Sequence, residues 1–375
     1  MASQSILRLT AIAGFALAGL GQTPPPTVPV PADPLELVTG SIQTVDTPQA
    51  RTAVLDLLNR ARNSYALRTG GIAYDLKVSF TVNSGGRSQY DGDWQMEEMF
   101  MPGQGLRWTA TSTAGYSATA IMGGKHVYTH GTTNIMPLRL QEARSALFGP
   151  IATPNFTNGD VIRTSTAAFN GMQLTCVLLS GKNNSSSVTS GRRWEESEEC
   201  IDPQSGLLMV HSLAPGLYEL YDYANAPTLG AHKLPHSVTI TEGGKKVMAL
   251  EVNSLTELTT PDASQFKPNA QMANEPGVAV AQARKASVFY ASSAPTEGAT
   301  IHPVCVFGLI TPSGQLVEAH SLQPSDPNSD AAVQTAEHMD FRMPAPMGAL
   351  PEQRFGFVIV KFLQQNRNTD PGKER

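Results

Sequence analysis

Apolar and polar residues alternate along much of the first two thirds of this chain. In the segment 72–82 the apolar side chains of Tyr74, Leu76 and Val78 stand two positions apart, which is the period of a strand with one buried face. Segments of the same kind, separated by glycine turns, follow one another as far as Leu258. Repeated strands with short turns predict an antiparallel meander, and a sheet of about ten strands is expected to curl.

A longer period, close to 3.6 residues, predicts two helices. Thr47 and Pro48 supply the cap and the first residue of one helix, and Gly70 ends it. The second helix is predicted over 138–148, inside the strand-rich region. The apolar positions on one face of the first helix are Val54, Leu57, Leu58, Ala61 and Tyr65.

The last quarter of the chain predicts the order strand, strand, helix, strand. The apolar run 301–310 is followed by a turn at 312–314 and a returning strand at 315–320. Helix-start residues lie within 325–330, and the apolar segment 355–363 forms the final strand.

Short motifs in this quarter resemble the carboxy-terminal domain of TonB-type energy transducers. They are Glu297-Gly298, Ser313-Gly314, Ser325-Asp326-Pro327, Ala331-Ala332, Phe341 with Pro344-Ala345, and Gly348. The resemblance implies a module that recognises a partner peptide at a sheet edge. The implied docking positions, on the first and last strands, are Val304, Val306, Phe357 and Ile359.

The region 47–261 resembles the LolA/LppX-like lipoprotein-carrier fold. An amino-terminal helix precedes a long meander, and Asp202-Pro-Gln-Ser-Gly-Leu207 is similar to that family's turn between strands. The resemblance implies a half-open barrel that holds acyl chains and has helices packed on its concave face. Ordinary core packing is the alternative for the same apolar residues, because periodicity does not fix the curvature of a sheet. The side chains expected to line the cavity are Tyr74, Leu76, Phe80, Trp94, Met96 and Trp108.

Composition adds the domain organisation and excludes one class of partner. With 375 residues, 41% of them hydrophobic, the chain is long enough for two packed domains. A net charge of −5 and the lack of a Lys/Arg run longer than two residues argue against a nucleic-acid partner. The predicted divisions are a signal peptide at 1–21, a Pro-rich linker at 22–46, a curved-sheet domain at 47–261, a linker at 262–287, a TonB-like domain at 288–364 and a polar tail at 365–375.

The amino terminus has the pattern of a secretory signal. Arg8 precedes the apolar stretch 9–20, and Gly19 and Gly21 are small residues suited to cleavage before Gln22. The stretch is shorter than the roughly 20 residues that span a bilayer. We therefore expect an exported protein of the bacterial periplasm with no stable transmembrane span after cleavage. An uncleaved signal anchor is the alternative.

Export permits disulfide bonds. Cys176 and Cys200 lie in strand-like segments joined by the polar loop 181–191, so a bridge between neighbouring strands is expected. Cys305 lies in the apolar run 301–310, where a buried inert thiol is expected and a reactive thiol is the alternative.

Other polar residues form no recognisable catalytic or metal-binding motif. The pairs His126/His130 and His232/His236 would each lie about 13 Å apart on a strand, too far for one metal ion. We therefore expect no metal, no cofactor and no catalytic residues; an enzyme with dispersed catalytic residues is the alternative. The acidic clusters expected on a solvated outer face are Glu97-Glu98 and Glu195-Glu196 with Glu198-Glu199.

Together these patterns predict an α+β protein with a curved antiparallel sheet, helices on its concave face, and a small β-β-α-β domain. The predicted function is that of an exported, non-catalytic envelope protein. It binds a lipid or lipoprotein acyl chain in the first domain and docks an envelope protein through the second. The alternative is a protein-interaction component of a TonB-type energy-transduction or envelope assembly without lipid cargo.

Overall fold

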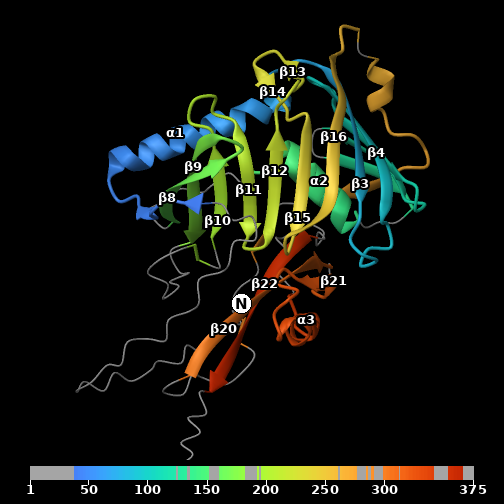
Figure 1. Cartoon of the computed structure of the whole chain (residues 1–375). Coiled ribbons are helices and arrows are strands. Elements are labelled where there is room, and N and C mark those ends of the chain that lie inside the picture. The colour runs from blue at the N-terminus through green and yellow to red at the C-terminus, as the bar shows by residue number, and fades with distance from the viewer. Residues whose placement is uncertain are drawn as a thin grey trace, which may run out of the picture.

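A large curved sheet and a small sheet below it make up the structure, a computed structural model of the chain (Figure 1). It describes residues 38–123, 126–132, 136–151, 160–181, 192–193, 196–260, 262–276, 284–285, 289–290, 299–311, 313–341 and 354–365. The helices are α1 (Pro48–Tyr65), α2 (Leu138–Phe148) and α3 (Ser329–Glu337), with the 3-10 helices η1 (Leu67–Thr69) and η2 (Ala263–Phe266). The strands are β1 (Val38–Thr39), β2 (Gln43–Thr44), β3 (Tyr74–Val82), β4 (Gly92–Met101), β5 (Gly105–Ser112), β6 (Ser117–Gly123), β7 (His126–Gly131), β8 (Asp160–Phe169), β9 (Met172–Gly181), β10 (Ser197–Ile201), β11 (Leu208–Ala214), β12 (Leu217–Asp222), β13 (Thr228–Leu229), β14 (His232–Lys233), β15 (Ser237–Glu242), β16 (Lys245–Glu257), β17 (Ala273–Pro276), β18 (Arg284–Lys285), β19 (Phe289–Tyr290), β20 (Ala299–Ile310), β21 (Leu316–Ser321) and β22 (Arg354–Gln365).

Fifteen of the described strands form the large sheet, which consists of two antiparallel meanders. One meander runs from β3 to β7, and the other from β8 to β16 without β13 and β14. They are joined where β16 pairs with β3, so that Leu250 lies opposite Phe80. The outermost described strands are β17 beside β7 and β1 and β2 beside β8, so the sheet is curved but not closed.

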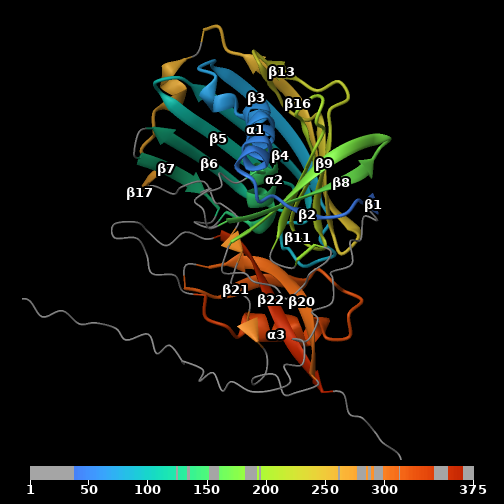
Figure 2. The ribbon, with the colours of Figure 1, turned by 90° about the vertical axis from the view of Figure 1, so that its left-hand side faces the viewer.

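The two longer helices, α1 and α2, lie between the arms of this curved sheet (Figure 2). The Thr47 hydroxyl accepts a hydrogen bond from the Ala50 amide, and Pro48 is the first helical residue, so the predicted start of α1 is confirmed. Its apolar face shares one core with the inward side chains of the sheet. The alternation predicted for 72–82 is also confirmed, because every second residue of β3, beginning at Tyr74, is buried.

The small sheet has the strand order β18-β22-β20-β21, with β19 also paired to β22, and α3 packs on one of its faces. The predicted order strand, strand, helix, strand is therefore confirmed as β20, β21, α3, β22. The strands β18 and β19 run parallel to β22, whereas β20 and β21 are antiparallel to their neighbours.

Parts of both predicted linkers belong to the large sheet. The strands β1 and β2 lie within 22–46, and β17 lies within 262–287. The predicted signal segment lies outside the described residues, as does the polar tail apart from Gln365, which ends β22. Among the described helices, none has the length and apolar character needed to cross a membrane.

Candidate functional site

Helix α2 fills the space between the arms of the large sheet. Nine of its 11 residues are buried, including Arg139, Glu142 and Arg144. A helix that is buried on all sides is a core element. Its charged side chains must therefore find partners inside the protein, because an unpaired buried charge is costly.

Arg144 finds its partner in Glu98 on β4. Its Nη2 donates to Glu98 Oε2 at 3.0 Å, and Arg68 donates to both oxygens of the same carboxylate at 2.8 Å. The hydroxyl of Tyr74 donates a further hydrogen bond at 2.8 Å. Glu98 is fully buried, so the prediction that it lies on a solvated face is wrong, while its neighbour Glu97 is 34% exposed. The error arose because a charged residue in a strand was assumed to face water. Glu98 instead follows Trp94 and Met96 in the alternation of β4 and points into the core as they do.

The six side chains predicted to line a cavity are all buried in the large core. Phe80 and Trp94 stack with ring centroids 5.3 Å apart. The Trp108 ring lies 4.7 Å from the guanidinium of Arg144, so α2 occupies the space over this part of the sheet. The remaining members of the predicted set, which pack in the same core, are Tyr74, Leu76 and Met96.

A second buried ion cluster lies where the small domain meets the large sheet. Glu242, at the end of β15, accepts hydrogen bonds from Arg139 of α2 and, at 2.8 Å, from Arg87. His320 of β21 places Nε2 2.7 Å from the same carboxylate, and its Nδ1 lies 2.9 Å from the Glu318 carbonyl. Burial would raise the pKa of Glu242, but Arg139 and His320 hold it well below its ordinary value.

Two hairpin turns of the large sheet touch the small domain closely. A Cβ at Gly216 would lie 2.8 Å from the Leu322 carbonyl oxygen, and one at Gly243 would lie 2.6 Å from Cδ of Pro324. Both glycines have positive φ, which other residues rarely adopt. The two parts of the chain therefore meet in a closely packed seam.

The small sheet buries both faces, and three of the four predicted docking residues lie inside the protein. Val304 and Val306 pack against α3, while Cys305, Phe307 and Leu309 join the core of the large domain. β20 lies between β21 and β22, so it has no free edge, and β22 is paired with β18 and β19 on its other side. Of the implied docking residues Val304, Val306 and Phe357 are buried, and the side chain of Ile359 is outside the described residues.

A row of three titratable side chains crosses the concave face on β10, β11 and β12. In the strand register His211 lies opposite Glu199 on one side and Glu219 on the other. His211 Nδ1 lies 3.8 Å from a Glu199 oxygen, and exposed fractions of 1–4% show that all three residues are buried. We call these three residues the acidic row. Glu199 was expected on a solvated face, which is wrong because four consecutive residues of β10, Glu198 to Ile201, are buried.

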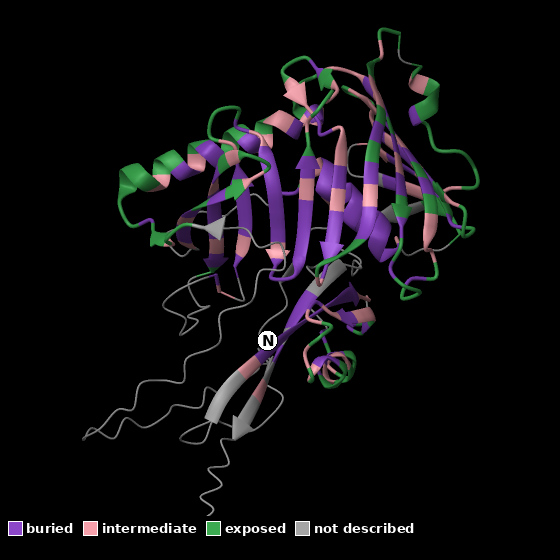
Figure 3. Cartoon of the chain, in the orientation of Figure 1, coloured by how far each residue is buried: buried purple, intermediate pink, exposed green. Residues whose placement is uncertain are grey.

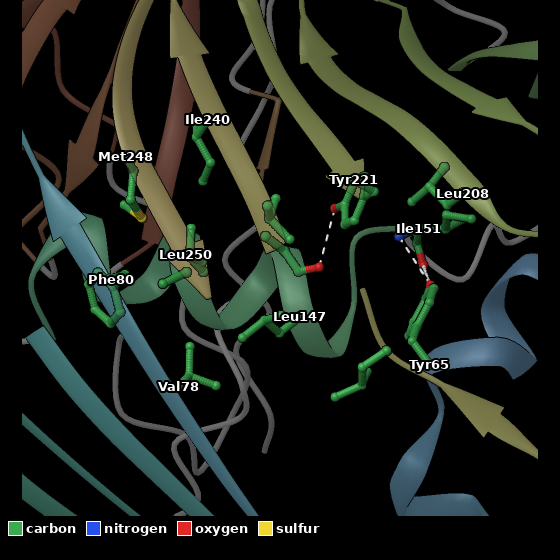
Figure 4. Packing of buried hydrophobic residues seen from close by; sticks show 14 of the residues in the cluster. Tyr65, Val78, Phe80, Leu147, Ile151, Leu208, Tyr221, Ile240, Met248 and Leu250 are labelled. Atoms are coloured by element: carbon green, nitrogen blue, oxygen red, sulfur yellow. Dashed lines mark hydrogen bonds between the residues drawn. The ribbon is translucent and has the colours of Figure 1, made fainter. Parts of the chain in front are cut away.

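Tyrosines and the end of α2 surround the acidic row. The Tyr221 hydroxyl lies 2.5 Å from Glu219 Oε2 and 3.2 Å from the Ala146 carbonyl in the last turn of α2. Tyr65, at the end of α1, contacts the backbone of Ile151 through its hydroxyl (Figure 4). Burial, with a smaller contribution from nearby Glu142, raises the pKa of Glu219 to about 8, although the Tyr221 hydrogen bond opposes this.

The cysteine prediction is confirmed. Cys176 and Cys200 lie opposite one another on β9 and β10 and form a disulfide. Glu198 lies close to both sulfur atoms, but the disulfide removes the thiolates that a metal would need. Cys305 is buried, as expected.

The histidine pairs do not converge. His232 Nδ1 lies 2.8 Å from the Asn63 carbonyl, whereas His236 lies 3.9 Å from Glu251. His130 is exposed on β7, and the side chain of His126 is outside the described residues.

Sequence reasoning missed the residues that carry the polar interior. Arg139, Arg144, Glu219, Glu242 and His320 were not singled out. A signal was present in the sequence, because Glu219 alternates with the apolar residues Leu217 and Tyr221 and so lies on the same face of β12 as they do. A charged residue in the buried phase of a strand predicts a buried polar site.

Comparison with known proteins gives remote structural neighbours. No family model matches the chain, and no curated protein does. A LolA superfamily protein from Nitrosomonas europaea is 14% identical, with a TM-score of 0.35 over 57% of this chain and 97% of its own. A DUF1329 family protein from Desulfovibrio piger is 8% identical, with a TM-score of 0.37 over 58% and 96%. LprF from Mycobacterium bovis is 12% identical, with a TM-score of 0.23 over 56% and 97%. At these TM-scores neither family membership nor function follows from the likeness.

Proposed function

We propose that this chain is an exported, non-catalytic binding protein. It takes the acyl chain of a lipid or lipoprotein into the space between the arms of its curved sheet, and α1 is the movable cover. The docking of a protein at the β20 or β22 edge is not part of the proposal, because pairing and the seam occupy those strands.

The observation that carries the proposal is the difference between the two helices on the concave face. α2 is held by ion pairs from Arg139 and Arg144 to the sheet. α1 buries five of its 18 residues along a single apolar stripe, and its outer face is exposed (Figure 3). Moving α1 would uncover apolar surface of the core, whereas moving α2 would break buried ion pairs. The five buried residues of α1 are Val54, Leu57, Leu58, Ala61 and Tyr65.

Rough energies make an acyl chain a suitable replacement for that stripe. Exposing a buried Val or Leu side chain costs about 1.5–3 kcal/mol. Exposing the five buried side chains of α1 therefore costs on the order of 8 kcal/mol. An acyl chain with about 14 buried CH₂ groups contributes about 11 kcal/mol at about 0.8 kcal/mol each. The gain is of the same size as the cost, so a chain of this length can displace α1 reversibly.

The disulfide between Cys176 and Cys200 supports an exported protein, because such bonds persist in oxidising compartments. The buried cysteines lie on β9 and β10, within the same sheet that would hold the ligand. A periplasmic location is therefore part of the proposal.

A disulfide staple between α1 and the sheet tests the proposal. A Cβ at Gly206 would lie 3.4 Å from the Cβ of Arg60, close to the spacing of disulfide-bonded residues. We expect the full chain with Arg60→Cys and Gly206→Cys to lose uptake of an uncharged fluorescent acyl probe at least tenfold when oxidised. Mild reduction should restore uptake, because α1 is then free to move.

The controls separate the staple from its side effects. Gly206→Cys alone carries the backbone strain of a side chain at positive φ, so it is a control beside Arg60→Cys alone. Both should bind the probe as the parent chain does, and so should the parent under the same reductant. The buried Cys176–Cys200 bond should survive mild reduction, which mass analysis of alkylated protein can check. Full uptake by the oxidised staple would show that α1 is not the cover.

A further inference from the structure

Within the acidic row, Glu219 differs from four other buried carboxylates in its partners. Glu98, Glu196, Glu198 and Glu242 each lie within 3.1 Å of an arginine. Glu219 instead has the Tyr221 hydroxyl against it, and the charged group that acts on it is the carboxylate of Glu142. An ionised carboxylate in such surroundings is costly without a cation.

The position of the row fits a ligand that enters beneath α1. Tyr65, the last residue of α1, is close enough to interact electrostatically with both Glu199 and Glu219. The phase of β12 turns Glu219 toward the core that α1 and α2 cover, beside Leu217 and Tyr221. A ligand that replaced the apolar stripe of α1 would therefore bring its polar end to the row.

The end of α2 adds a second feature of the same sign. The Ala146 carbonyl, 3.2 Å from the Tyr221 hydroxyl, lies in the last turn of this helix of 11 residues. Carbonyls in a last turn lack partners within the helix and carry the negative end of its dipole. The Glu219 carboxylate and the carboxyl end of α2 thus both contact the Tyr221 hydroxyl, and each of them favours a positive charge.

We propose that Glu219, with Glu199 and His211 beside it, binds the ammonium group of an amphiphilic ligand whose acyl chain lies under α1. The inference rests on the proposed function and names the ligand class, an amphiphile with a primary amine. The ammonium donates hydrogen bonds to the two carboxylates, and a ring nitrogen of His211 accepts one or donates to a glutamate according to its tautomer. Charge-assisted bonds of this kind are stronger than those an uncharged hydroxyl makes.

Binding of the amine should release a proton. At pH 7 the carboxyl of Glu219 is mostly protonated, because its pKa is about 8. An ammonium beside it favours the ionised form, so the carboxyl loses its proton as the amine binds. The alcohol of the same chain length brings no charge and should release none.

The test compares dodecylamine with dodecanol as competitors of an uncharged fluorescent acyl probe on the full chain at pH 7. We expect dodecylamine to displace the probe at a concentration at least tenfold lower than dodecanol. Glu219→Gln should remove that preference, so that the two ligands displace the probe at similar concentrations. Calorimetry in two buffers should show proton release with the amine on the parent chain and none on the variant.

Matched variants protect the test against general charge effects. Glu97→Gln removes a partly exposed carboxylate from β4, paired with Lys77 at 3.5 Å, and should keep the full preference for the amine. Glu199→Gln should weaken the preference, and it replaces Glu219→Gln if that variant does not fold. Equal displacement by both ligands on the parent chain, or an undiminished preference in both row variants, overturns the inference while the proposed function stands. Displacement by neither ligand, with no uptake of the probe, overturns both.

Discussion

Glu242 and Glu219 lie on the neighbouring strands β15 and β12, face the same interior and are both only 4% exposed, yet their surroundings oppose one another. Glu242 is held by Arg87, Arg139 and His320, and its pKa is lowered. Glu219 has a tyrosine and a second carboxylate nearby, and its pKa is raised to about 8. Burial alone therefore does not decide the state of a carboxylate; a neighbouring cation does. One of these sites is complete within the chain, whereas the other is suited to a cation from outside.

The largest effect is expected when the complete site loses its cation. Arg139→Ala leaves Glu242 and Glu142 buried with less positive charge, so the free energy of unfolding should fall by about 3–5 kcal/mol. Urea unfolding of the full chain at pH 7 measures this change. A loss below about 1 kcal/mol would show that the seam is not stabilised by this ion cluster.

A smaller effect of opposite sign is expected at the other glutamate. The pKa of Glu219 is higher in the folded chain than in the unfolded one, so its contribution to stability is full below about pH 4.5 and is lost as the pH rises toward 8. Glutamine does not ionise, so Glu219→Gln should not lose stability in this way as the pH rises. The variant should be more stable than the parent by about 2–3 kcal/mol at pH 7.

Unfolding of both proteins in urea between pH 4.5 and 8 distinguishes the two sites. The parent should lose stability over this window relative to Glu219→Gln. Glu142, whose pKa burial raises to about 7, adds a loss of the same sign in both proteins. The pKa of Glu242 is lowered, so its contribution is present above about pH 4.5 and lost at lower pH. If the free energies of unfolding of parent and variant change in parallel with pH, Glu219 is ionised in the folded chain.

The smallest effect is expected at an exposed ion pair. Lys77 lies 3.4 Å from Asp75 and 3.5 Å from Glu97, and its side chain is 54% exposed. Lys77→Ala should change the urea midpoint far less than Arg139→Ala, because water screens exposed pairs. This variant is the matched control for the loss of a positive charge.

Local patterns in the sequence predicted the elements of the fold well. The cap at Thr47 and Pro48, the alternation of β3 and the pairing of Cys176 with Cys200 all depend on residues close together in the chain or on one strand pair. The order of the last four elements follows from local signals as well.

The polar interior could not be predicted in the same way. The cluster at Glu242 joins Arg87, Arg139 and His320 from separate elements, and only the tertiary fold brings them together. The small domain was expected to present a free edge, but the short strands β18 and β19 cover part of β22 and carry no pattern of their own. Charged residues in strands suggested an outer face at Glu98 and Glu199, although both side chains are buried.

The most direct test of the account is mass spectrometry of organic extracts from gently purified full chain. The small domain shares the core of the large one, so the chain should be purified whole. The account predicts an amphiphile with an acyl chain and a primary amine, near one per protein molecule in the parent and depleted in Glu219→Gln. A clean extract, from protein that also fails to take up an acyl probe, would contradict it.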